Sequence, residues 1–306
     1  MKYTFINQAS GGGAGSLVGS DDNWYRLHFK IDTKYAGQKF MLNLEGAHTG
    51  VRMYVNGTLM TGISKVAADA QATHVVGFVP VVVDLTPLLH IDGTTDNVIA
   101  VDVSKGSPWF ETPNFSEAYR FGQSMTGLFR NVYLYVTNPL HIPLNVYSNQ
   151  GTWGTYMGTV SEVPAASGTA TAASAVVEVQ TNVLNESAST QQVTLTTQIV
   201  DASGNVIVTA PPVTQSVPPM TPSMFPSGAQ PMFDQQITVA NPTLWYPNNS
   251  TYGKPYMYRV YHIVSVNGAV VDFSTEPAWH SHAHVGWQLS LFQWARALHV
   301  GRVWPL

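Results

Sequence analysis

Two glutamates lie among aromatic residues in the segment SPWFETPNFSEAYRF, residues 107–121. Glu111 and Glu117 are the only closely spaced glutamate pair with many aromatic neighbours in the sequence. Two carboxyl groups can hydrolyse a glycosidic bond as a general acid paired with a base or a nucleophile. Spacing along a loop does not set the distance between the groups. The two glutamates are therefore candidate catalytic residues whose geometry the sequence leaves undefined.

The aromatic residues around this pair are candidates for sugar binding. Trp109, Phe110 and Tyr119 flank the two glutamates, and Phe115 and Phe121 lie in the same segment. Large aromatic side chains offer apolar area with a fixed shape, and their faces stack on the C–H face of a sugar ring. The alternative is a loop whose aromatic side chains pack onto its own domain. The sequence leaves both interpretations open.

Three alternating histidines are the candidate metal ligands. His280, His282 and His284 occur in HSHAH and would share one face of a strand. No carboxylate nearby in the sequence completes a ligand set, so incidental histidines in an exposed tail are the competing interpretation, and we predict no bound metal. The glycine-rich segment at residues 11–16 lacks the spacing of a nucleotide-binding loop, so no cofactor is predicted.

Composition excludes several partners. Only 10% of the 306 residues are charged, against about 25% in an average soluble domain, and the net charge is −4 without any basic run. Nucleic acid is therefore not an expected partner. The longest apolar run, residues 75–83, is too short to span a bilayer and contains Pro80, so no membrane association is expected. The N-terminus lacks the apolar core of a signal peptide, and the sequence does not identify a compartment.

The elements that must position these residues are β-strands. In WYRLHFK, apolar Tyr25, Leu27 and Phe29 alternate with polar Arg26 and His28, which predicts one buried and one solvated face. The pairs Asn56-Gly57 and Asn267-Gly268 lie between apolar runs and predict tight hairpins. Many short strands without a long helical period predict an all-β chain built from sandwiches.

Breaks in the strand pattern suggest three regions. Two prolines interrupt it in TNPLHIPLN, residues 137–145, and residues 277–306 contain four of the eight tryptophans but no Asp, Glu or Lys. We therefore predict a first domain at residues 1–140, a second at 141–276 and a divergent Trp- and His-rich tail at 277–306. The proline-rich residues 211–231 are typical of an extended loop, here within the second domain.

Ordered sequence fragments resemble a known enzyme family. NWYRLHFKI, LNLEGAHTGVRMYVNGTLMTG, VVVDLTPLL, DNVIAVDV and MTGLFRNVYLYV follow one another between residues 23 and 136. Together they resemble the sugar-binding jelly-roll domain of glycoside hydrolase family 2, the β-galactosidase and β-glucuronidase family. LWYPNNSTYGKPYMYRVYHIVSVNGAVVD resembles the end of the family's second, immunoglobulin-like domain. The resemblance covers about residues 11–276 and implies a jelly-roll sandwich followed by an immunoglobulin-like sandwich.

The resemblance also implies a place for Gly127 and Arg130. They would lie where a loop enters the last jelly-roll strand, near the edge that faces the catalytic domain in this family. Gly127 permits the turn, whereas Arg130 either ties two loops together or contacts a sugar. The family's two catalytic glutamates lie on a (β/α)₈ barrel, and neither has a matching position here, so the chain looks truncated before the barrel.

Three functions follow as alternatives. The first is carbohydrate binding by the non-catalytic portion of a family 2 glycosidase, through Trp109, Phe110, Tyr119 and Arg130, with a β-linked galactoside or glucoside as partner. The second is a small glycosidase that uses loop carboxylates or residues shared between chains. The third is a structural fragment that oligomerises, and a homo-oligomer is expected in any case. The parent family is extracellular or periplasmic.

Overall fold

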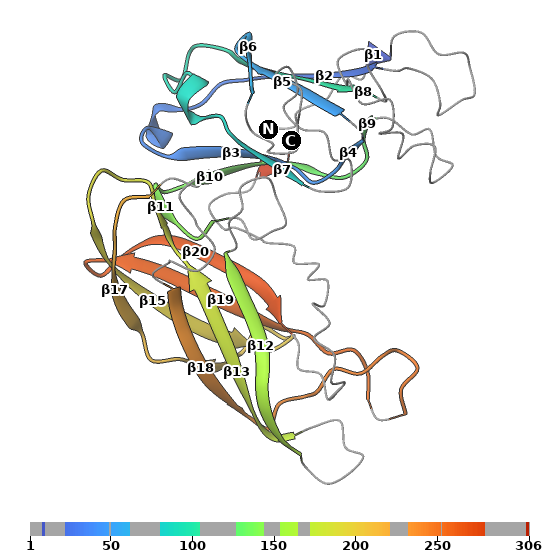
Figure 1. The fold of residues 1–306 in the computed structure, drawn as a ribbon, viewed down its shortest axis with the longest axis vertical. Coiled ribbons are helices and arrows are strands. Elements are labelled where there is room, and N and C mark those ends of the chain that lie inside the picture. The colour runs from blue at the N-terminus through green and yellow to red at the C-terminus, as the bar shows by residue number, and fades with distance from the viewer. Residues whose placement is uncertain are drawn as a thin grey trace. The chain divides into compact units, whose positions relative to one another are not determined.

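The computed structural model describes residues 8–9, 22–48, 50–61, 80–104, 127–143, 154–164, 172–220, 232–251, 253–278 and 304–305. These residues belong to two compact units (Figure 1), one containing β1–β10 and β21, the other β11–β20. Regular structure in the described ranges is strand, apart from two 3₁₀ turns, η1 (Thr33–Tyr35) and η2 (Thr86–Leu88). The predicted all-β fold class is therefore confirmed. The described part of the chain contains no helix with the length and apolar content that a membrane span requires.

The first unit is an antiparallel jelly-roll sandwich. Its five-stranded sheet has the order β1 (Gln8–Ala9), β2 (Asp22–Phe29), β8 (Asn97–Ser104), β5 (Gly50–Val55), β6 (Thr58–Leu59). Its four-stranded sheet has the order β21 (Trp304–Pro305), β10 (Val132–Thr137), β3 (Lys39–Leu44), β7 (Val81–Asp84). A short pair, β4 (Ala47–His48) and β9 (Gly127–Leu128), joins two loops at the edge. Apart from β1–β2 and the β5–β6 hairpin, neighbouring strands in both sheets are not consecutive in the sequence, which is typical of a jelly roll.

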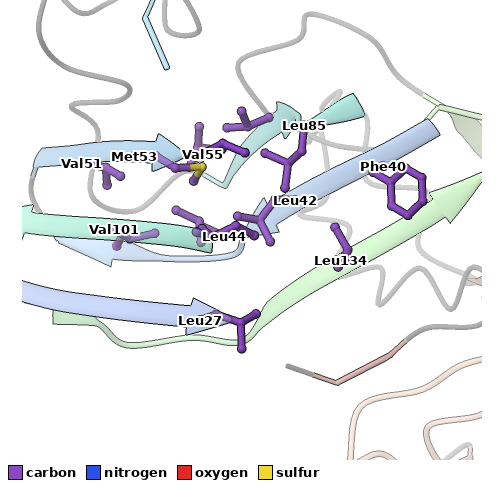
Figure 2. Close-up of a cluster of buried hydrophobic side chains, with 14 of the residues drawn as sticks. Leu27, Phe40, Leu42, Leu44, Val51, Met53, Val55, Leu85, Val101 and Leu134 are labelled. Atoms are coloured by element: carbon purple, nitrogen blue, oxygen red, sulfur yellow. The ribbon is translucent and has the colours of Figure 1, made fainter. Parts of the chain in front are cut away.

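One apolar cluster fills the space between these two sheets. Leu27 and Phe29 of β2 enter it, whereas Arg26 and His28 on the same strand are exposed, as the alternation predicts. Leu42 and Leu44 enter from β3 of the other sheet, and Figure 2 shows side chains of both sheets in this layer. Burying each such side chain stabilises the fold by about 1.5–3 kcal/mol. This cluster sets which face of β2 remains at the surface.

Both predicted Asn-Gly hairpins are present. Asn56 and Gly57 have φ of 48° and 83°, and Asn267 and Gly268 have 50° and 79°. The first joins β5 to β6 through two residues, as in a type I′ turn. The Asn56 side chain also donates to the Leu88 carbonyl at 2.7 Å and accepts from the Val98 amide at 2.7 Å. The two residues thus adopt the positive φ values that the turn requires, and the Asn56 side chain anchors the turn to the rest of the unit.

The second unit is an immunoglobulin-like sandwich. One sheet has the order β12 (Thr155–Pro164), β13 (Ala172–Asn182), β18 (Met232–Ala240). The other has the order β16 (Val206–Thr209), β15 (Gln191–Val200), β19 (Tyr258–Val266), β20 (Ala269–Ala278), and β17 (Val213–Val217) also pairs with β15. A short pair, β11 (Leu140–His141) and β14 (Leu184–Asn185), completes the described strands. All these pairings are antiparallel.

The core of the second unit is divided by a polar layer. Two apolar clusters occupy opposite ends of the strands. Along β19, Val260 belongs to one cluster and Val264 to the other, and the buried His262 lies between them. The equivalent middle positions of three further strands are also buried and polar: Thr181, Thr197 and Gln235. The layer therefore crosses both sheets.

Candidate carbohydrate-contact edge of the jelly roll

The loop that leads into β10 requires a glycine at position 127. Gly127 has a φ of +130°, a backbone conformation that side-chain-bearing residues rarely adopt. A Cβ atom at this position would lie 2.6 Å from the Tyr25 hydroxyl oxygen. That hydroxyl accepts a hydrogen bond of 3.2 Å from the Leu128 amide. Gly127 therefore permits the turn and also leaves space for the tyrosine that fastens it.

A second glycine makes room for an aromatic ring at the same edge. A Cβ atom on Gly46 would lie 2.7 Å from the ring of Phe129. The Phe129 amide donates to the Gly46 carbonyl at 3.2 Å, and the Glu45 amide donates to the Asn131 carbonyl at 3.0 Å. Together with the β4–β9 pair, these bonds hold the loops at residues 45–48 and 127–131 together. The backbone thus determines where Phe129 lies.

Phe129 and Arg130 form a cation–π pair at this edge. The guanidinium carbon of Arg130 lies 5.5 Å from the ring centroid of Phe129, and Phe129 is 42% exposed. Arg130 is exposed as well. The pair places an apolar ring beside a guanidinium group, the two features that sugar recognition uses. We call Gly46, Gly127, Phe129 and Arg130 the Phe129–Arg130 edge. The sequence motif predicts Arg130 as a site residue, whereas nothing in the sequence singled out Phe129.

The other predicted site residues lie outside the described residues. These are the aromatic and acidic candidates Trp109, Phe110, Glu111, Glu117 and Tyr119, and the histidines His280, His282 and His284. The first group belongs to the connection between β8 and β9, which ends at the Phe129–Arg130 edge. Among the residues that the structure describes, no group of three or more His, Asp or Glu could hold a metal ion.

The sequence pair Asn185-Glu186 has a structural role. The Asn185 side chain is buried and donates to the carbonyls of Ser189 and Val217, each at 2.9 Å. It also accepts from the Ser187 amide at 3.0 Å. The Glu186 amide donates to the Pro139 carbonyl at 2.8 Å. Asn185 therefore shapes the turn after β14, and Glu186 is half-buried there.

The first unit also has a concave surface that was not predicted from the sequence. The outer face of the five-stranded sheet has a depression of about 340 Å³, lined by Trp24, Arg26, His28, Tyr54, Gly57, Val98 and Ala100. The alternation along β2 predicts Arg26 and His28 on the solvated face, and Trp24, two residues before Arg26, shares that face. Their proximity to Tyr54 depends on the strand order β2-β8-β5, which the sequence pattern does not contain.

Comparison with known proteins supports the sequence resemblance. The family model "Glycosyl hydrolases family 2" matches residues 163–278, within the second unit. A beta-glucuronidase from Formosa agariphila is 30% identical over 259 residues, which are 83% of this chain and 23% of that protein. Beta-galactosidase BoGH2A from Bacteroides ovatus is 29% identical over 268 residues, which are 88% of this chain and 25% of that protein.

Solved structures give the same result. A beta-glucuronidase from glycoside hydrolase family 2 has a TM-score of 0.66 and 28% identity, over 85% of this chain and 24% of that one. A family 2 member from Bacteroides cellulosilyticus has a TM-score of 0.62 and 24% identity, over 85% of this chain and 28% of that one, and supports the fold alone. The chain spans about a quarter of the length of these relatives. The matches extend over both β-sandwiches, and over that extent the chain is similar to members of glycoside hydrolase family 2.

Proposed function

We propose that this chain binds β-linked glycans as the non-catalytic portion of a family 2 glycosidase. The observation that carries the proposal is the Phe129–Arg130 edge, where an exposed ring and a guanidinium lie together on a backbone shaped by two glycines. Relatives are a beta-glucuronidase and a beta-galactosidase, which favours β-glucuronides and β-galactosides as ligands. β-Glucosides, which the sequence resemblance also implies, remain candidate ligands.

Each group at the edge has a defined role in this proposal. The Phe129 ring stacks on the C–H face of a pyranose, and Arg130 donates N–H groups to hydroxyl or carboxylate oxygens. Trp109, Phe110 and Tyr119 add aromatic area from the β8–β9 connection. An edge with so few groups binds weakly, and we expect a dissociation constant of about 1 mM, near −4 kcal/mol.

Titration of the full chain with β-linked disaccharides tests this proposal. We expect saturable binding that Phe129→Ala and Arg130→Ala each weaken by about tenfold, measured by calorimetry or ligand-observed NMR. Tyr156→Ala and Arg259→Ala are matched controls, because both side chains are exposed on the second unit. Equal binding by all four variants would contradict a role for the edge.

The same preparation separates the two alternative functions. Release of nitrophenol from aryl β-galactoside, β-glucoside and β-glucuronide measures turnover. Activity that is lost in Glu111→Gln or Glu117→Gln would favour the small glycosidase over glycan binding alone. Light scattering at micromolar concentration measures assembly: we expect a dimer or larger species, and a 33.3 kDa monomer would contradict this expectation.

A further inference from the structure

Side chains of neighbouring strands shape the depression on the outer face of the five-stranded sheet. Val98 and Ala100 of the central strand β8 line it, and Ala100 is smaller than its neighbours on either side. The register places Ala100 between Arg26 of β2 and Tyr54 of β5. Short side chains on the middle strand and long ones on both flanking strands hollow the surface. The volume of about 340 Å³ lies at the lower end of the range for small-molecule sites.

An aromatic pair forms one wall of this depression. Trp24 and Tyr54 stack with their ring centroids 6.1 Å apart and their planes at 25°. Trp24 is 37% exposed, so its indole ring retains area for a ligand. In the register, Trp24 lies opposite Asp102, whose buried carboxylate accepts from Arg52 at 2.7 and 3.2 Å. This ion pair links β5, the strand that carries Tyr54, to the central strand β8.

Arg26 supplies a positive charge that the described structure does not neutralise. His28 Nδ1 pairs with Asp96 at 2.6 Å, and Arg52 pairs with Asp102. Arg26 is exposed and makes no hydrogen bond or ion pair in the part of the chain that the structure describes. The depression therefore joins an aromatic wall to an unpaired guanidinium, which suits a planar carboxylate through paired N–H bonds.

We propose that this depression binds a uronate residue of an acidic glycan. The pyranose ring stacks on the Trp24–Tyr54 wall above Ala100, and its carboxylate accepts from the Arg26 guanidinium. The His28–Asp96 pair, at the other end of the same strand face, offers polar atoms to ring hydroxyls. A neutral sugar would leave Arg26 unused, and one unpaired cation on a chain of net charge −4 does not suit a polyphosphate.

This site is separate from the Phe129–Arg130 edge. Trp24 and Arg26 point away from the core, whereas Tyr25 between them contacts the loop at Leu128. Successive residues of a strand face opposite sides of the sheet, so the two surfaces use opposite faces of β2. The uronate site does not rest on glycan binding at the edge, and variants of one surface test it without altering the other.

Titration of the full chain with oligogalacturonate and with its neutral galactose counterpart tests the proposal. We expect the uronate to bind at least tenfold more tightly, and the difference to shrink as salt rises. Arg26→Gln should weaken uronate binding about tenfold and abolish the preference, and Arg26→Lys should restore part of it. Trp24→Ala should weaken binding of both probes. If Trp24→Ala does not fold, Trp24→Phe replaces it in the test, and this variant should retain binding because it keeps an aromatic ring.

Controls and a third probe decide the outcome. Arg259→Gln, at an exposed position on the second unit, should leave uronate binding unchanged. A sulfated galactose oligosaccharide that binds as tightly as the uronate would overturn the assignment of a carboxylated ring. Absence of saturable binding, or uronate binding that Arg26→Gln leaves intact, would overturn the site itself. Loss of binding in Phe129→Ala with normal binding in Arg26→Gln would assign the glycan to the edge instead.

Discussion

The two sandwiches differ in where they place their polar groups. In the first unit a single apolar cluster fills the interior, and buried polar side chains such as Asp102 lie on the outer face of a sheet. In the second unit two apolar clusters are separated by a layer that includes His262 and Gln235. In the first unit, these polar side chains therefore lie on the outer side of a sheet. In the second unit, a layer of polar side chains lies inside the core. Both proposed glycan surfaces lie on the first unit.

Hydrogen bonds orient the groups of the polar layer. Gln235 Nε2 donates to the Pro211 carbonyl at 3.0 Å, which leaves its Oε1 to accept from the Thr197 hydroxyl at 2.5 Å. Because the Thr197 proton is directed to Gln235, its oxygen accepts from Nδ1–H of His262, 3.3 Å away. Nε2 of His262 then carries a lone pair without a hydrogen-bond partner among the described residues. Burial lowers the pKa of His262 to about 3, so the ring is neutral in the folded chain.

The largest effect should come from breaking the buried ion pair of the first unit. Asp102→Ala leaves Arg52, whose side chain is only 20% exposed, without its carboxylate, and we expect a loss of about 3–5 kcal/mol in unfolding free energy. Urea unfolding followed by tryptophan fluorescence measures it. Lys34→Ala, which removes an exposed pair with Asp32, should change stability by less than about 1 kcal/mol. Equal losses in both variants would remove the distinction between buried and surface charge.

Acid should destabilise the second unit through its polar layer. The unfolded chain protonates His262 near the ordinary histidine pKa of 6.5, and the folded chain does so only near 3, so stability is lost as pH falls from 6.5 toward 3. The loss approaches about 1.4 kcal/mol per pH unit, or about 2–3 kcal/mol by pH 4.5. His262→Leu should flatten this pH profile relative to the parent. Identical profiles for parent and His262→Leu would refute the prediction.

Gly127→Ala should destabilise the first unit at the Phe129–Arg130 edge. We expect a loss of about 2–3 kcal/mol, because the substitution combines an unfavourable φ with a contact to the Tyr25 hydroxyl. Tyr25→Phe in the same chain removes the oxygen at 2.6 Å and should recover part of the loss, since the next ring atom is 3.8 Å away. Gly57→Ala also has a positive φ but open space around it, and should cost about 1 kcal/mol. A double variant no more stable than Gly127→Ala alone would show that only the backbone conformation matters.

Gly46→Ala should give the smallest loss. Its Cβ atom would meet the ring of Phe129, but that ring is partly exposed and can move outward, so we expect about 1 kcal/mol or less. The larger consequence should be for glycan binding at the Phe129–Arg130 edge, which we expect to weaken as in Phe129→Ala. Thermal unfolding and disaccharide titration on the same sample measure the two effects. Destabilisation as large as that of Gly127→Ala would mean that Phe129 is held as firmly as Tyr25.

Much of the strand arrangement follows from local pattern. The alternation around Leu27 and Phe29 predicts both the strand and its buried face, because side chains along a strand alternate between the two sides. Asn56-Gly57 and Asn267-Gly268 predict hairpins because both residues tolerate positive φ. The ordered fragments between residues 23 and 136 were enough to indicate the family. Arg130 could be named as a site residue for the same reason, since its motif stands at a recognisable place in the jelly roll.

Only the tertiary structure brought distant residues together. Trp24 stacks on Tyr54 because β8, residues 97–104, inserts between their strands, and no local pattern specifies which strand becomes the neighbour. Gly127 is required partly by the hydroxyl of Tyr25, about a hundred residues earlier in the chain. The polar layer of the second unit arises because single polar residues on separate strands meet at one level through strand register. Short-range periodicity determines which face a residue occupies, and long-range pairing determines what it meets there.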